Sequence, residues 1–215
     1  MSQVTTEGTG KGSIFVVDDD AAVRDSLAAL LEAEGFAVEP FESARAFLEG
    51  FRPKEACCVI ADIRMPDMDG LELQEEIIRR GWGLPVVIIT GHGDVPLAVR
   101  AMKAGAVDFI EKPFDDEVLR AGIERGLAQS RRSRGESAAA QEAETRIAQL
   151  TAREREVMEH LVAGRPNKVI AHRMDISPRT VEVHRGRVME KLQARSLSDL
   201  VRMALAAKIE ISAAT

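Results

Sequence analysis

The chain has 215 residues and a net charge of −6, with 45% hydrophobic and 30% charged residues. This is the composition of an ordinary soluble protein, and the length suits one large or two small domains. No apolar run approaches the roughly 18 residues that a membrane span requires, so none is predicted. The N-terminus up to Gly12 lacks the apolar core of a signal peptide and is expected to form a flexible leader.

Charge is unevenly divided along the chain. Residues 1–146 carry 17 Lys and Arg against 27 Asp and Glu, a balance of −10, whereas residues 147–215 carry 12 against 8, a balance of +4. The basic C-terminal part suggests a polyanionic partner. Cys57 and Cys58 are adjacent in an apolar run, where neighbouring side chains point to opposite faces of a strand, so no disulfide is expected. Unpaired cysteines indicate a reducing compartment, the cytoplasm.

Short apolar runs alternate with helical patterns from residue 14 to about residue 127. Pro40 is expected to end the second run, and Asp20, Ser43 and Asp94 are expected to cap three of the helices. Because strands and helices alternate, we predict an α/β doubly wound sheet of five parallel strands with helices on both faces. The predicted strands are 14–17, 36–38, 57–62, 84–89 and 107–111.

Polar residues stand where four of these strands end. Asp18 and Asp19 follow the first strand, Asp62 ends the central one, and Thr90 and Lys112 end the last two. The carboxyl ends of parallel strands meet at one edge of the sheet, where ligands bind. Clustered carboxylates favour a hard cation such as Mg²⁺, beside which an Asp can attack phosphorus and form an acyl phosphate. A Lys and a hydroxyl would then neutralise and hydrogen-bond the phosphoryl oxygens.

Residues 128–146 contain no large apolar side chain and cannot bury a core. We therefore predict three segments, with a first domain at 12–127, a linker at 128–146 and a second domain at 147–212. The composition of the linker is compatible with helix as well as with coil. Gly135 is the expected break if the linker is helical.

Apolar residues return at helical spacing beyond Leu150. Thr151 and Glu154 form a capping-box pattern, and Asn167 is the expected cap of a short second helix. Ser177-Pro178 places a cap and a first-turn proline before a longer helix that reaches about Leu192. A short helix followed closely by a longer one predicts an all-α helix-turn-helix domain.

The strand-end residues, together with segments 89–99 and 104–114, resemble the receiver domain of response regulators of the FixJ type, which has a flavodoxin-like fold. The segments Asn167–Ala171 and Ser177–His184 are similar to LuxR-type DNA-binding domains. The resemblance implies that Asp62 is the phosphoacceptor. It also implies that Mg²⁺ is held by Asp19, Asp62 and the backbone carbonyl of Arg64, with Asp18 acting through water.

Further roles follow from the same resemblance. Thr90 and Lys112 are expected to contact the phosphoryl group, Phe109 to respond by packing, and the Lys112-Pro113 bond to be cis. The face expected to dimerise on phosphorylation carries Val99, Met102, Lys103 and Asp108. The residues expected to contact double-stranded DNA, at phosphates or base edges, are Lys168, Arg179, Thr180, Glu182, Val183, His184, Arg185, Arg187 and Lys191.

The sequence thus predicts a DNA-binding transcription regulator, not an enzyme, that a sensor histidine kinase phosphorylates on Asp62. Its homodimer would bind paired half-sites and act with RNA polymerase, and the FixJ resemblance implies nitrogen-fixation genes as targets. Two alternatives remain open. A phosphatase working through an aspartyl phosphate would need a carboxylate where Arg64 stands. A constitutive DNA-binding protein would have an inert receiver, against which the intact set of strand-end residues argues.

Overall fold

The computed structural model describes residues 11–91 and 95–209. The predicted leader up to residue 10, the predicted cap Asp94 and residues 210–212 of the predicted second domain lie outside the described residues. The chain divides into two compact units, Met1–Arg134 and Gly135–Thr215. Within the described ranges, no helix combines the length and the apolar character needed to cross a membrane.

The first unit is built on a five-stranded sheet in the order β2-β1-β3-β4-β5, in which every neighbouring pair is parallel. This order confirms the predicted doubly wound, flavodoxin-like fold. The strands are β1 (Ser13–Val17), β2 (Ala37–Phe41), β3 (Cys57–Asp62), β4 (Val86–Thr90) and β5 (Asp108–Glu111).

Position in the sheet explains the sequence of each strand. Every residue of β3 and β4 is buried, because helices cover both faces of the central strands. The prediction that Pro40 ends the second strand is wrong, since Pro40 lies inside β2 in register with Val16. β2 is an edge strand, where the missing N–H of a proline can face away from the neighbouring strand.

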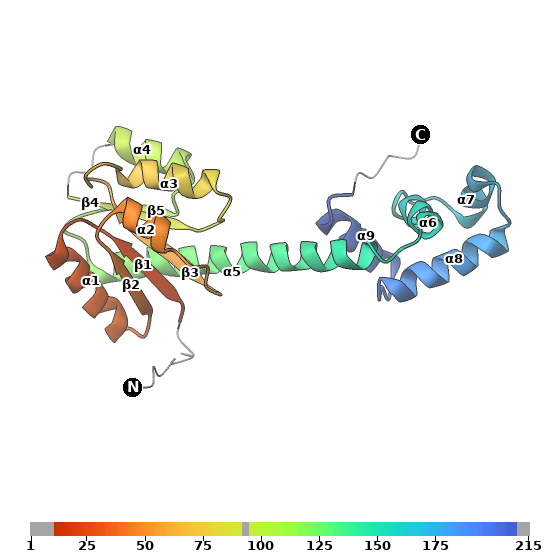
Figure 1. The fold of residues 1–215 in the computed structure, drawn as a ribbon, viewed down its shortest axis with the longest axis horizontal. Coiled ribbons are helices and arrows are strands. Elements are labelled where there is room, and N and C mark those ends of the chain that lie inside the picture. The colour runs from red at the N-terminus through yellow and green to blue at the C-terminus, as the bar shows by residue number, and fades with distance from the viewer. Residues whose placement is uncertain (1–10, 92–94, 210–215) are drawn as a thin grey trace. The chain divides into compact units, whose positions relative to one another are not determined.

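Helices cover the sheet in two layers (Figure 1). One core cluster joins Phe47 of α2, Ile77 of α3 and Ala101 of α4 to the sheet, and the other joins Leu31 of α1 and Leu119 of α5. Asp20 and Ser43 cap α1 and α2 by accepting backbone hydrogen bonds, as predicted. The helices are α1 (Ala21–Ala33), α2 (Ala44–Gly50), α3 (Gly70–Arg79), α4 (Val95–Lys103) and α5 (Asp116–Ile147).

α5 is longer than the sequence indicated, because it contains the whole predicted linker. The expected break at Gly135 is wrong. One glycine costs a helix roughly 1 kcal/mol relative to alanine, which the Ala, Glu, Gln and Arg around it outweigh. Ser130 is 3% exposed, and its Oγ accepts a hydrogen bond of 3.2 Å from the Cys57 N–H at the start of β3. The first turn of the predicted linker therefore packs against the sheet.

The second unit is all-helical, as predicted. Thr151 and Glu154 form the capping box of α6, and Ser177 caps α8 with Pro178 in its first turn. The prediction for Asn167 is wrong, because Asn167 is already the first residue of α7 and no side chain caps that helix. The helices in the described part of this unit are α6 (Ala152–Val162), α7 (Asn167–Met174), α8 (Pro178–Lys191) and α9 (Leu197–Ala206).

Candidate functional site

The carboxyl edge of the sheet brings two carboxylates and one ammonium into contact. Lys112 Nζ lies 2.9 Å from Asp18 Oδ2 and 2.8 Å from Asp62 Oδ1. Both carboxylates are buried, with 2% of Asp18 and 7% of Asp62 exposed. The structure therefore brings together three predicted site residues from the carboxyl ends of β1, β3 and β5.

The loop after β3 shapes the surroundings of Asp62. Its Oδ2 accepts a hydrogen bond of 2.6 Å from the N–H of Arg64, so each carboxylate oxygen has a donor. Gly70 comes so close to the strand end that a Cβ there would lie 2.3 Å from the Asp62 carbonyl oxygen. Only glycine fits this approach. The role of Gly70 was not predicted from the sequence, although a glycine that opens a helix directly after the cap Asp69 is a signal for it.

The three consecutive acidic residues after β1, residues 18–20, differ in how far they are buried. Oδ1 of Asp18 accepts a hydrogen bond of 3.0 Å from the Asp20 N–H, and Arg24 donates to the Asp18 carbonyl at 2.7 Å. Asp19 is exposed, and Asp20 caps α1. The contact of Arg24 was not predicted either, because its only signal in the sequence is its position one turn after that cap.

Thr90 ends β4, and Phe109 lies in the neighbouring strand β5, which Lys112 follows directly. Thr90 is fully buried, and its carbonyl accepts a hydrogen bond of 2.7 Å from the Lys112 N–H. Phe109 is half-buried against the core cluster that contains Ala101. The Lys112-Pro113 bond is cis. Burial alone would lower the pKa of Lys112, but its hydrogen bonds to Asp62 and Asp18 and their charges raise that pKa above its usual value.

The chemistry of the cluster suits a hard cation. No group of three or more His, Cys, Asp or Glu side chains within residues 11–91 and 95–209 is arranged to hold a metal ion. Asp18 and Asp62 are nevertheless buried, acceptor-only oxygen donors that share one ammonium. Mg²⁺ prefers such carboxylates, completed by water and phosphate oxygens. The donor set therefore fits Mg²⁺.

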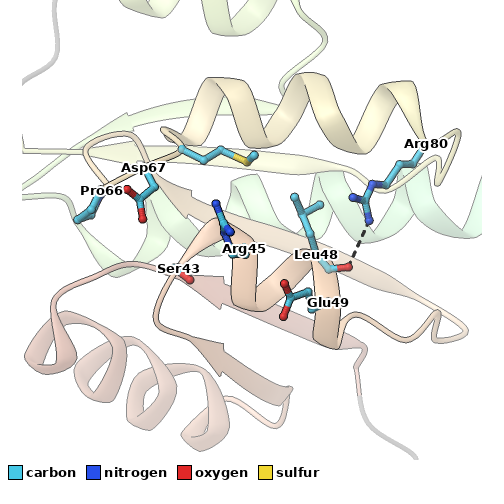
Figure 2. Close-up of a pocket in the computed structure, with 8 residues that line it drawn as sticks. Ser43, Arg45, Leu48, Glu49, Pro66, Asp67 and Arg80 are labelled. Carbon is cyan, nitrogen blue, oxygen red and sulfur yellow. Dashed lines mark hydrogen bonds between the residues drawn. The ribbon is translucent and has the colours of Figure 1, made fainter.

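A separate cavity of about 330 Å³ lies beside the loop after β3 (Figure 2). Arg80 closes one side of it by donating a hydrogen bond of 3.3 Å to the Leu48 carbonyl. Asp67, with a φ of 66°, lines the other side. The cavity contains none of the predicted site residues. It is lined by Ser43, Arg45, Leu48, Glu49, Pro66, Asp67, Met68 and Arg80.

The predicted dimer face lies on α4 and β5. Val99 and Met102 are 45% and 48% exposed, although both are apolar, and Lys103 is exposed beside them. Asp108 forms an ion pair with Arg125 of α5. Three of the four predicted residues thus form an exposed surface of α4, and the fourth is tied to its neighbouring helix.

The helix-turn-helix exposes most of its predicted DNA-contacting residues. Val183 is 49% exposed, a large fraction for an apolar residue in a helix. His184 is only half-exposed, and its Nδ1 is buried without a hydrogen-bond partner among the described residues. Thr180 is half-buried and bonds to Ser177 at the cap of α8. The exposed members of the set are Lys168, Arg179, Glu182, Val183, Arg185 and Arg187.

Lys191 differs from the rest of that set, because it pairs with a buried acid. Its Nζ lies 2.6 Å from Glu154 Oε2 and 3.3 Å from the Gln149 carbonyl. Glu154 is 3% exposed, and its hydrogen bonds with Lys191 and Thr151 lower its pKa to about 2. A contact of Lys191 with DNA phosphate would therefore compete with an ion pair inside the second unit.

Two family models match the chain. The model of the response regulator receiver domain matches residues 14–124, and that of the luxR family of bacterial regulatory proteins matches residues 148–204. The transcriptional regulatory protein FixJ of Bradyrhizobium diazoefficiens is 53% identical over 199 residues, which cover 93% of this chain and 97% of that protein. The chain belongs to the response regulators of the FixJ type. FixJ of Rhizobium meliloti is 50% identical and covers 90% of this response regulator.

Solved structures resemble this response regulator over most of its length. Response regulator StyR has a TM-score of 0.78 at 44% identity and covers 90% of the chain, with 98% of StyR matched. Full-length FixJ from B. japonicum has a TM-score of 0.56 at 52% identity and covers 94% of the chain, with 100% of FixJ matched. The predicted family and fold are confirmed. The family consists of transcription regulators and not of enzymes. Its receiver domain implies a histidine kinase as partner and typically uses Mg²⁺. Its output domain implies DNA binding.

Proposed function

We propose that this response regulator accepts a phosphoryl group on Asp62 from a sensor histidine kinase and then activates transcription as a DNA-bound dimer. The observation that carries this proposal is the contact of 2.8 Å between Lys112 Nζ and Asp62 Oδ1. It supports the proposal because a carboxylate that could act as a nucleophile lies beside a cation that can neutralise phosphoryl oxygens.

Asp62 would attack phosphorus through one carboxylate oxygen, forming a P–O bond while the bond from phosphorus to the donor histidine nitrogen breaks. Lys112 would then contact a phosphoryl oxygen in place of the carboxylate, and Thr90 would donate a hydrogen bond from its hydroxyl. Phe109 has no hydroxyl, so its part in the response would be a change of packing. The half-buried ring is in a position to make that change.

The metal ligands in this proposal are Asp19, Asp62 and the carbonyl of Arg64, with Asp18 acting through water. Bound Mg²⁺ supplies positive charge against the oxygens of the transferred group. The Arg64 N–H already holds Asp62 Oδ2 at 2.6 Å, which orients the carboxylate within the cluster. Asp19 is exposed, so its carboxylate is accessible to an ion from solvent.

The proposed output is binding of α8 in the major groove at each of two paired half-sites, followed by action on RNA polymerase in the cytoplasm. Exposed Arg and Lys side chains of α7 and α8 support it, since phosphates position such helices. We also propose nitrogen-fixation genes as targets, because the relatives include proteins named FixJ. The proposed domain limits are 12–127 and 147–212.

Incubation with acetyl phosphate and Mg²⁺, followed by intact-mass spectrometry, tests the proposal. The wild-type protein should gain one acid-labile phosphoryl group, and Asp62→Ala should gain none. Asp67→Asn is the matched control, because it removes an exposed carboxylate from the same loop and asparagine tolerates the positive φ of this position, so it should be phosphorylated normally. A wild-type protein without an adduct would indicate an inert receiver. Continuous release of inorganic phosphate over many turnovers would indicate a phosphatase instead.

A further inference from the structure

Helix α4 is held to its unit by little buried surface. Ala101 is its only buried residue within Val95–Lys103, and Leu97 is partly buried. Val95, by contrast, is 76% exposed. Because apolar attraction is non-directional, contacts this sparse determine the position of α4 along the neighbouring helix only weakly.

A buried side chain of α3 makes a directional contact with α4. Gln74 of α3 is 1% exposed, and its Nε2 donates a hydrogen bond of 3.3 Å to the carbonyl oxygen of Ala101. In Figure 1, α3 and α4 lie next to each other on the same side of the sheet. A hydrogen bond is lost when donor and acceptor move apart by about an ångström, so this contact defines one position of α4.

Core stability does not explain a glutamine at this position. Oε1 of Gln74 is buried and has no hydrogen-bond partner among the described residues. A buried acceptor without a donor costs free energy, which an apolar side chain of the same size would avoid. Leu73 and Ile77, on the same helix, are apolar and buried in the adjoining core cluster. We propose that Gln74 is a positioning residue that fixes α4 in one place on α3.

This proposal deepens the proposed function, on which its consequence for dimerisation rests. Val99 and Met102 project from the helix that Gln74 holds. If these residues form the dimer face, the hydrogen bond from Gln74 to Ala101 keeps that face in the arrangement described here. Loss of the bond should therefore make other positions of α4, including one that favours dimers, more accessible.

The substitution Gln74→Met removes the donor and keeps the volume and helix propensity. The Ala101 carbonyl stays paired, because it also accepts a hydrogen bond of 3.0 Å from the Ala106 N–H. Hydrogen exchange of amides 95–106 in the full chain should become roughly two- to tenfold faster, as expected for one buried hydrogen bond. Glu75→Met, an exposed substitution on the same helix, is the control and should leave that exchange unchanged.

The proposal would be overturned if hydrogen exchange of amides 95–106 were unchanged in Gln74→Met. It would also be overturned if exchange in α1 and α3 became faster by the same factor as in 95–106, because that result would indicate a merely structural role. Sedimentation of the protein without phosphodonor tests the α4 dimer face separately from the positioning role of Gln74. A monomer–dimer dissociation constant that falls by the same factor supports both the positioning role and the α4 dimer face. Faster exchange in α4 with an unchanged dissociation constant supports the positioning role and contradicts the dimer face.

Discussion

The ammonium of Lys112 lies 2.8 Å from the carboxylate of Asp62, which stands 50 residues earlier in the chain. The same nitrogen lies 2.9 Å from Asp18, so one positive charge serves two buried negative ones. Hydrogen bonding to both raises the pKa of Lys112 despite its burial. The lysine therefore stays charged at neutral pH and stabilises the carboxylate pair where a dication is expected to bind.

The first prediction is that Lys112→Met strengthens Mg²⁺ binding. A charged ammonium within about 5 Å of a dication repels it, so its removal should raise the affinity roughly tenfold. Calorimetric titration measures the change. Lys103→Met removes the same charge from an exposed position on α4 and should leave the affinity unaltered. Weaker Mg²⁺ binding by Lys112→Met would show that the ion does not share the carboxylates with this lysine.

Local pattern was enough to predict the cluster at the sheet edge. Asp18, Asp62 and Lys112 each follow a short apolar run, and a parallel sheet must gather the ends of its strands at one edge. The caps of α1, α2, α6 and α8 were also predictable, because a cap depends on residues within one turn. Chemistry and local geometry were thus encoded within a few neighbouring positions.

Contacts between elements were not predictable in this way. Gln74 meets Ala101 across 27 residues and Lys191 meets Glu154 across 37, and neither pair has a sequence signal of its own. The continuation of α5 through Gly135 was equally undetermined, since a polar segment rich in Ala and Glu suits helix and coil alike. Packing against other elements decides such cases, as Ser130 shows by bonding to β3.

The second prediction concerns acid stability of the second unit. Glu154 has a pKa lowered to about 2 by its hydrogen bonds to Lys191 and Thr151, against an ordinary value of 4.5. A lowered folded pKa gives stability that is present above the unfolded pKa and is lost as the pH falls from about 4.5 towards about 2. Wild-type stability should therefore decline across this window more steeply than that of Glu154→Gln.

The single tryptophan, Trp82, lies in the other unit, so its fluorescence does not report the unfolding of this one. Nuclear magnetic resonance signals of α6 and α8 can follow the unfolding instead. Lys191→Met should reduce the pH dependence by removing the ammonium partner of Glu154. Glu159→Gln, an exposed change on the same helix, is the control and should behave like wild type. Equal pH profiles for wild type and Glu154→Gln would disprove the assigned role.

The third prediction separates base recognition from phosphate contact. Glu182→Ala should change sequence preference by about 1–3 kcal/mol at one base pair, because a carboxylate can accept from a cytosine amino group. Lys168→Ala should instead weaken all sequences about equally and reduce the dependence of affinity on salt. Both side chains are exposed, so neither substitution should disturb the core. Binding-site selection with each variant makes the test, and an unaltered profile for Glu182→Ala would reject its contact with a base.

The fourth prediction follows a charge on Asp62 to the surface of α4. A phosphoryl group adds negative charge and strong acceptors near Thr90, whose hydroxyl should move towards it and leave space that Phe109 can fill. That movement should reshape the surface around Val99 and favour a symmetric receiver dimer. A dimer raises the effective concentration of the second DNA-binding unit, so affinity for a paired site rises without new base contacts.

Val99→Asp places a charge at the centre of this surface, where 45% of the side chain is exposed. Phosphorylation should remain normal, while dimerisation with acetyl phosphate present should be lost in analytical ultracentrifugation, because an unpaired charge is costly to bury. Ile78→Asp is the matched control, since Ile78 is an exposed apolar residue of α3, 57% accessible and outside the α4 surface. It should dimerise like wild type. If phosphorylated Val99→Asp still dimerises and binds a paired site tightly, activation does not proceed through α4, and release between the domains becomes the better explanation.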